Sequence, residues 1–375
     1  MAPLKATLAA TVAVGAGVAL ARAERERRAA SERRARDRRF ALLPGERVGE
    51  ALRRIALAQL DVAIESLEGG DGKLSAEKRV HEARKALKRL RALLRLVRDE
   101  LGERAYARES ALVRRAGKRL AQARDAEVLL STLDDLIERH PKTLGGRRGV
   151  QRLRAQLQSE RDGAAELALA DSATRAGVLD DLRALRVRVA GWRLADPGGI
   201  EAVEAALRRL YATGRRRMRR AERAKRAPGR KLHEWRKRVK DLRYAAEMLQ
   251  RSDDAGRRRK GTGPGRGKRA GKLSSAEAGF IGRVARQADD LGELLGEEHD
   301  LAVLAERVRA EARATRASGA PGRGTRKALL KLIARRRKRL RKRALRDGRR
   351  LFGRAPKGFV RRVRAAAALG SVSRR

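Results

Sequence analysis

Two stretches of the sequence, residues 81–91 and 233–243, repeat the same basic side chains at the same spacing. The first reads HEARKALKRLR and the second HEWRKRVKDLR, and seven of their eleven columns are identical. Each begins with His, and Arg and Lys residues follow three to four positions apart. Residues at that spacing lie on one face of a helix. Both stretches therefore predict a helix with a cationic stripe along one side.

The residue types in these stripes suit the binding of phosphate groups. An Arg guanidinium offers a planar fork of donors to phosphate oxygens, and a Lys ammonium supplies a mobile point charge. A His beside a phosphate would favour its protonated form, which donates from both ring nitrogens. A solvated surface is the other interpretation, although such surfaces usually mix both signs of charge. The candidate binding residues are His81, Arg84, Lys85, Lys88, Arg91 and Arg95 in the first stripe and His233, Arg236, Lys237, Lys240 and Arg243 in the second.

A second pair of matching segments follows the stripes. The segment RDAEVL at 124–129 aligns with HDLAVL at 299–304. The His of the stripe and the Asp of this segment are 44 residues apart in the first copy and 67 in the second. The difference of 23 equals the length of the Gly-rich, basic segment 251–273. The chain therefore reads as a tandem duplication with one inserted loop. Asp125 and Asp300 each stand near an expected helix start, which they would cap; the alternative is that they orient Arg residues of the stripes.

The elements that must position the stripes are also helical in pattern. Apolar residues recur three and four positions apart, and no period-two run of β-branched or aromatic residues indicates a strand. This pattern favours an all-α fold built from bundles, with Trp192 and Trp235 in the core. The expected helices are 46–67, 75–100, 103–122, 125–139, 150–169, 173–190, 199–226, 230–250, 275–296, 300–317 and 324–348, some of which could merge.

The overall charge narrows the classes of partner. Of 375 residues, 96 are Lys or Arg and 46 are Asp or Glu, which gives a formal net charge of +50. A protein with this excess attracts polyanions or anionic membrane surfaces. The chain has no Cys, which excludes a disulfide scaffold and a thiol nucleophile and fits a cytoplasmic setting. Its four Phe, three Tyr and two Trp offer little material for stacking nucleic-acid bases.

No set of residues indicates an enzyme, a cofactor or a metal centre. The pair His81 and Glu82 begins like a zinc-protease motif, but Lys85 stands where the second His is required. The Gly-rich segment 251–273 lacks the Gly-Lys-Ser/Thr pattern of a phosphate-binding loop. We therefore expect binding without catalysis, with no cofactor and no metal.

Two further partners stay open on the sequence alone. Residues 6–21 form an uncharged, Ala-rich run before an Arg-rich flank, which fits either a frayed helix or a weak membrane contact. The segment 326–350 holds 14 basic residues in 25 and could bind nucleic acid without sequence specificity. The sequence leaves the oligomeric state open.

Taken together, the motifs resemble the CHAD family, the conserved histidine α-helical domain. The resemblance spans about residues 44–365 and rests on HxxRxxxKxLR from His81, RDxxVL from Arg124 and HxxRKxxKxLRY from His233. It implies two pseudo-twofold-related helical bundles around a basic cavity, which bind inorganic polyphosphate through the stripe residues. It also implies, for some members, a location at polyphosphate granules. The chain departs from the pattern at Glu247, which stands at the position of Arg95, and at His299.

The expected organisation has four parts. An N-terminal extension covers 1–43, and the first helical half covers 44–195. The second half covers 196–365 and includes the inserted loop 251–273, and a C-terminal tail covers 366–375.

Overall fold

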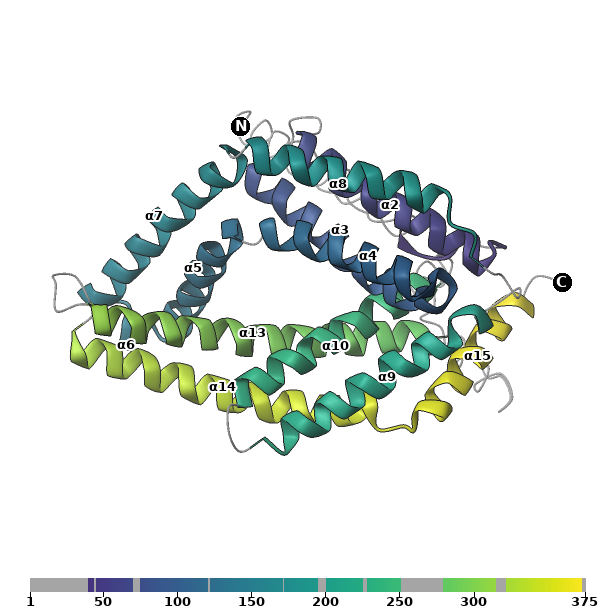
Figure 1. Ribbon diagram of the computed structural model, residues 1–375. Coiled ribbons are helices and arrows are strands. Elements are labelled where there is room, and N and C mark those ends of the chain that lie inside the picture. The colour runs from purple at the N-terminus through teal and green to yellow at the C-terminus, as the bar shows by residue number, and fades with distance from the viewer. Residues whose placement is uncertain are drawn as a thin grey trace, which may run out of the picture.

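The computed structural model describes residues 40–43, 45–69, 75–120, 122–170, 172–194, 200–224, 228–250, 279–314 and 322–372. Every regular element in these ranges is an α-helix, so the all-α prediction is confirmed (Figure 1). The helices are α2 (Val48–Glu68), α3 (Ala76–Leu96), α4 (Arg98–Arg119), α5 (Gln122–Arg139), α6 (Pro141–Leu144), α7 (Arg148–Ala170), α8 (Ser172–Ala190), α9 (Glu201–Glu222), α10 (Pro228–Leu249), α13 (Phe280–Ala314), α14 (Arg323–Phe352) and α15 (Pro356–Val372).

Two regions singled out in the sequence lie outside the described residues. They are the run 6–21, considered for a membrane contact, and the inserted loop 251–273. Among the helices that are described, none is both long enough and apolar enough to cross a bilayer.

The helix boundaries differ from expectation at a few informative residues. The expected helices 275–296 and 300–317 form one helix, α13, because Gly296 makes room for a neighbouring side chain instead of ending the helix. Asp300 therefore lies inside α13, and the prediction that it caps a helix start is wrong. Asp125 belongs to the start of α5, but its side chain lies outside the described residues, so its capping role stays a prediction.

Two helices, α6 and α15, were not anticipated by the sequence patterns. α15 begins at Pro356, whose missing N–H is harmless at the first helical position, and it runs into the region expected as a tail. At the other end, Phe40 and Leu42 of the expected extension are buried, and the Leu42 N–H donates to the Met248 carbonyl over 3.0 Å. The last residues of the extension therefore belong to the folded body.

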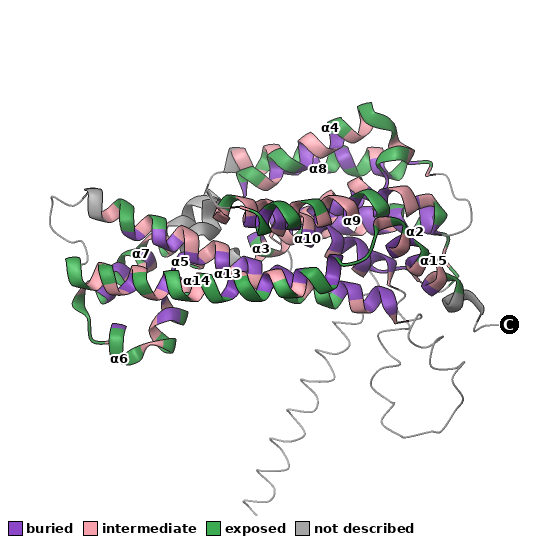
Figure 2. Ribbon diagram, turned by 90° about the horizontal axis from the view of Figure 1, so that it is seen from below, coloured by how far each residue is buried: buried purple, intermediate pink, exposed green. Residues whose placement is uncertain are grey.

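The helices pack around two hydrophobic cores. The larger core joins α2, α3, α4 and α8 to α9, α10, α15, the first half of α13 and the end of α14. The smaller core lies between α5, α6, α7, the second half of α13 and the first half of α14. In Figure 1, α5 and α7 run from the α2–α3–α4–α8 group to the far ends of α13 and α14. Figure 2 shows the buried faces turned inward along these helices.

Helix contacts follow the same order in the two copies of the repeat. α2 packs on α3, α3 on α4 and α5 on α7, and α8 returns to α2. Correspondingly, α9 packs on α10, α10 on α13 and α13 on α14, and α15 returns to α9. The long α13 takes the places of both α4 and α5. A duplicated unit would produce this correspondence, although both cores draw on both copies. The duplication and the halves 44–195 and 196–365 stay predictions.

Close helix crossings fix the orientation of α10. A Cβ atom on Gly348 of α14 would lie 2.4 Å from Cη2 of Trp235 in α10, and one on Gly214 of α9 would lie 2.5 Å from Cε1 of Phe352. Trp235 is 0% exposed and Trp192 is also buried, so the core prediction for both Trp residues is confirmed. Because Trp235 is held on all sides, the opposite face of α10 has a fixed direction.

We predict that Gly348→Ala destabilises the protein by about 1–3 kcal/mol, because the added methyl group meets a Trp ring that cannot move. The matched control is Gly163→Ala in α7, where no atom lies within 4 Å of the added Cβ. That change should be neutral or stabilise by up to about 1 kcal/mol through helix propensity. Chemical denaturation followed by circular dichroism measures both, and equal stability of the two variants would contradict the packing described.

Candidate functional site

The two stripe helices lie against each other. α3 begins at Ala76 after Ser75, whose hydroxyl accepts from the Lys78 N–H, and α10 begins with Pro228. Their apolar sides are buried, including Leu87 and Leu90 in α3. α3 and α10 are in contact, so the cations on their remaining faces meet across the junction.

A hollow of about 150 Å³ opens between these helices, and its lining is strongly basic. We call it the α3–α10 groove. Six of the predicted residues line it, and three other residues of α10 join them. The predicted ones are Lys88, Arg91, His233, Arg236, Lys237 and Lys240, and the others are Arg238, Asp241 and Tyr244. The expected meeting of the two stripes at one concave surface is therefore present.

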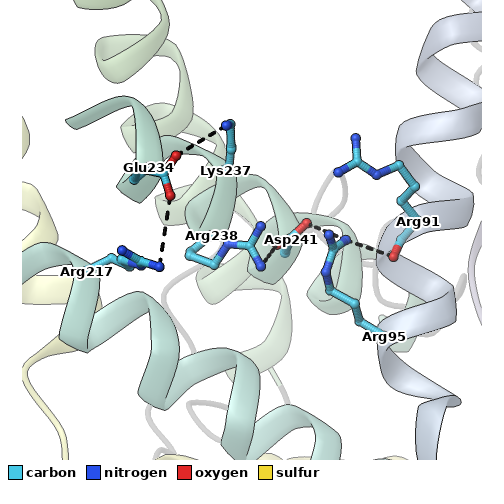
Figure 3. Close-up of polar contacts among 7 residues, drawn as sticks. All are labelled: Arg91, Arg95, Arg217, Glu234, Lys237, Arg238 and Asp241. Atoms are coloured by element: carbon cyan, nitrogen blue, oxygen red, sulfur yellow. Dashed lines mark hydrogen bonds and ion pairs between the residues drawn. The ribbon is translucent and has the colours of Figure 1, made fainter. Parts of the chain in front are cut away.

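Asp241 is the carboxylate that ties the two helices together at this groove. Its Oδ1 accepts from the Arg95 guanidinium of α3 over 3.1 Å, and its Oδ2 lies 3.1 Å from Nη1 of Arg238 (Figure 3). Arg95 also donates to the Arg91 carbonyl over 2.9 Å, while the Arg91 side chain extends toward α10. Arg95 thus serves as a link between helices, and Arg91 faces the groove.

The motif comparison missed Asp241, and one signal could have found it. Asp241 stands in the column where the first copy has Arg89. A single acid within a row of cations is expected to form an ion pair with one of them. Burial and the nearby charge of Arg95 lower the pKa of Arg91, which shows how closely the cations are held. One buried carboxylate partly offsets that repulsion.

His233 stacks on a second His that sequence reasoning did not assign to the site. The His233 and His299 rings are 4.1 Å apart between centroids, at 36°. Burial, the His299 ring and the charges of Lys237 and Arg236 lower the pKa of His233 to about 4. Burial together with Arg236, Lys237 and Arg337 lowers the pKa of His299 to about 4. Both rings are therefore neutral near pH 7 without a ligand.

Arg236 occupies the edge between two hollows. Its guanidinium lies against α13 where Gly296 has no side chain, and a Cβ there would be 3.2 Å from Nη2. Its Nε is buried without a hydrogen-bond partner in the described part of the chain. On the far side is a hollow of about 430 Å³ between α5, α10, α13 and α14. The lining of this second hollow includes five carboxylates, those of Glu127, Asp135, Glu293, Glu297 and Asp300. The predominantly cationic surface therefore ends at Arg236 and Lys240.

The other predicted residues lie outside the groove lining. His81 is exposed near the start of α3, and Lys85 lies 3.5 Å from Glu82. Arg84 donates to the Leu120 carbonyl at the end of α4.

Arg243 also lies apart from the groove, bound by two acids. It donates to Glu247 over 2.6 Å and pairs with Asp289. Although burial opposes its charge, these two carboxylates raise the pKa of Arg243 above its usual value. Arg243 is therefore already neutralised within the fold.

The described residues hold no group of three or more His, Asp or Glu arranged to bind a metal ion. The groove offers donors: ammonium and guanidinium groups from two helices and the imidazole of His233, whose ring contacts that of His299. Chemically, this arrangement can bind an anion that carries several negative charges along its length.

Comparison with known proteins assigns a family from the sequence and finds a similar fold among solved structures. The family model described as "CHAD domain" matches residues 54–260, which include both stripe helices. The crystal structure of the CHAD domain from the plant Ricinus communis is similar with a TM-score of 0.52 and 21% sequence identity, covering 84% of this chain and 95% of that one. None of the curated proteins matches the sequence.

We predict that Asp241→Asn lowers the free energy of unfolding by about 1–3 kcal/mol, because Arg95 and Arg238 would face each other without a counter-charge. Higher salt should recover part of the loss. The control is Asp180→Asn, since the Asp180 side chain is 74% exposed and its pair with Arg183 spans 3.4 Å. That change should cost less than about 0.5 kcal/mol. Equal losses in urea denaturation would contradict the linking role of Asp241.

Proposed function

This chain belongs to the CHAD domain family, and from that premise we propose that it binds inorganic polyphosphate reversibly, without catalysis, in the α3–α10 groove. The observation that carries the proposal is the convergence of the two stripes. Lys88 and Arg91 from one helix and Arg236, Lys237 and Lys240 from the other line the same hollow. A chain with one negative charge on every phosphate can satisfy cations from both sides at once.

The groove residues divide the work of binding by their chemistry. Arg91 and Arg236 offer bidentate forks to phosphate oxygens, and Lys88, Lys237 and Lys240 supply point charges that follow a moving chain. Successive turns place cations about 5–6 Å apart along each helix, so several phosphates are held together. We assign His81, Arg84 and Lys85 to the approach along α3. Arg95 and Arg243 support the helices through their carboxylate partners.

The His pair gives the groove a response to its ligand. Without ligand, burial and the surrounding cations lower the pKa of His233 and His299 and keep both rings neutral. A bound polyanion would offset Arg236 and Lys237 and favour the charged imidazolium. His233 would then donate to the ligand, as expected from the sequence, but only once the ligand is in place.

Polyphosphate binding of this kind would target the protein to polyphosphate granules. Nonspecific nucleic-acid binding is the alternative for the groove. A flexible single chain of phosphates fits a narrow hollow between two contacting helices better than a rigid duplex does. The alternative therefore predicts the opposite preference in a competition.

We expect duplex DNA to leave polyphosphate bound to the protein at physiological salt when both are supplied at equal phosphate concentration. Fluorescence anisotropy of a labelled long-chain polyphosphate, with unlabelled DNA as competitor, measures the preference. A groove that releases polyphosphate to DNA would contradict the proposal.

Neutralising the groove should abolish most of the affinity. The triple change Lys88→Gln, Arg91→Gln and Lys237→Gln removes three charge-assisted contacts of about 1.5–3 kcal/mol each, so we expect the Kd for polyphosphate to rise at least about a hundredfold. The control replaces the exposed Arg53, Lys357 and Arg361 with Gln, which removes the same net charge elsewhere. Equal weakening by both triples would mean that bulk charge alone binds polyphosphate.

Polyphosphate binding should take up protons and tighten as the pH falls from about 7.5 to about 5.5, because the bound anion raises the pKa of each His from its depressed value. The free protein behaves oppositely. Its His residues accept protons more readily when unfolded, so its stability declines as the pH falls below about 6.5. Calorimetric titration in buffers of different ionisation enthalpy counts the protons. The double variant His233→Gln, His299→Gln should lose this uptake, and an unchanged proton count would contradict the coupling.

A further inference from the structure

The outward face of α14 carries a second row of cations, apart from the groove. α14 runs along the outside of the molecule with exposed residues over much of its length (Figure 2). We call the row the α14 ridge. At 3.6 residues per turn its members fall within an arc of about 80° and span about 22 Å. They are Lys327, Lys331, Arg335, Lys338 and Lys342, and all five are exposed.

The ridge lacks the counter-charges that other exposed arginines have. On α8, Arg183 and Arg186 reach Glu68 and Asp61 of α2, and on α15 Arg364 pairs with Glu204 of α9. No acid in the described part of the chain pairs with any of the five ridge residues. Their mutual repulsion costs tenths of a kcal/mol for each pair one turn apart.

The opposite side of the same helix holds the ridge in place. Leu329, Ile333 and Leu340 are buried in the smaller core, against α13 and α5 to α7. Beyond the ridge, Arg346 pairs with Asp347 and Arg349 with Glu222. The five ridge cations therefore stand at a fixed spacing on a rigid helix, and paired cations lie beyond their C-terminal end.

We propose that the α14 ridge binds the phosphate backbone of a nucleic-acid duplex without reading its sequence. The ridge is convex, so it cannot surround a flexible chain. It therefore offers too few contacts to offset the conformational entropy that such a chain loses when it becomes ordered. A duplex presents phosphates that are already fixed in rows, and neutralising them releases condensed counterions. This surface is separate from the groove and does not depend on polyphosphate binding.

The residues of the ridge also fit this occupant better than two others. The segment 327–342 contains no aromatic residue, Asn or Gln, so it has no platform for stacking unpaired bases and no side-chain amide to read adenine. A bilayer would be held by charge alone, since the apolar side of α14 is buried and unavailable for insertion. A polyanion with a high and regular charge density is the remaining match.

The test compares two fourfold charge reversals in the full-length protein. The ridge variant carries Lys331→Glu, Arg335→Glu, Lys338→Glu and Lys342→Glu. The matched control reverses four exposed cations elsewhere, Arg53, Arg193, Lys357 and Arg361. Binding of a labelled random-sequence DNA duplex is measured by anisotropy over a range of salt concentrations, with polyphosphate and phosphatidylserine vesicles as parallel ligands.

We expect the ridge variant to bind the duplex at least about tenfold more weakly and to lower the slope of log K against log salt by about 3–4, while its polyphosphate affinity stays close to the control's. Equal loss of duplex binding in the control would overturn the proposal. So would vesicle binding that depends on the ridge while duplex binding does not. If the ridge alone carries the duplex and polyphosphate fails to bind at all, the ridge stands and the function proposed for the groove falls.

Discussion

The repulsion between cations on two contacting helices is the constraint on which this structure depends. α3 and α10 each present a row of positive side chains, and the fold brings the rows together instead of apart. Apolar burial on the backs of both helices holds them in place, and Asp241 sits between Arg95 and Arg238 where the rows meet. Lys237 also pairs with Glu234, yet the groove lining keeps more cations than carboxylates. Burial and these cations together keep the two imidazoles neutral.

Elsewhere in the described part of the chain, many arginines are paired with acids, which sets the groove cations apart. The fully buried Glu109 forms ion pairs with Arg108 and Arg188. The buried Glu298 forms ion pairs with Arg337 and Arg341. Many arginines of this very basic chain therefore have structural partners and contribute little to binding. The groove and the α14 ridge differ because their cations greatly outnumber nearby carboxylates. They also differ from each other: one is concave and enclosed by two helices, and the other is convex and open.

Much of the fold could be predicted from local pattern, and the limits have physical causes. Periodicity correctly placed the buried sides of α3 and α10, since it depends only on residues one turn apart. It could not separate Lys88 from Arg84 or Arg243, because their different roles come from contacts made by distant segments: the Leu120 carbonyl and Asp289. Gly296 reads as a helix break in the sequence, whereas its lack of a side chain accommodates Arg236. His299 joins His233 across 66 residues, a contact that no local spacing encodes.

Amine footprinting tests the central claim most directly. Brief acetylation followed by mass spectrometry reports the accessibility of each Lys in the intact protein, with and without long-chain polyphosphate. We predict that polyphosphate protects Lys88, Lys237 and Lys240 strongly, while the exposed Lys357 of α15, which does not line the groove, reacts as before. Protection spread evenly over exposed lysines, or absent from the three groove residues, would contradict a polyphosphate site between α3 and α10.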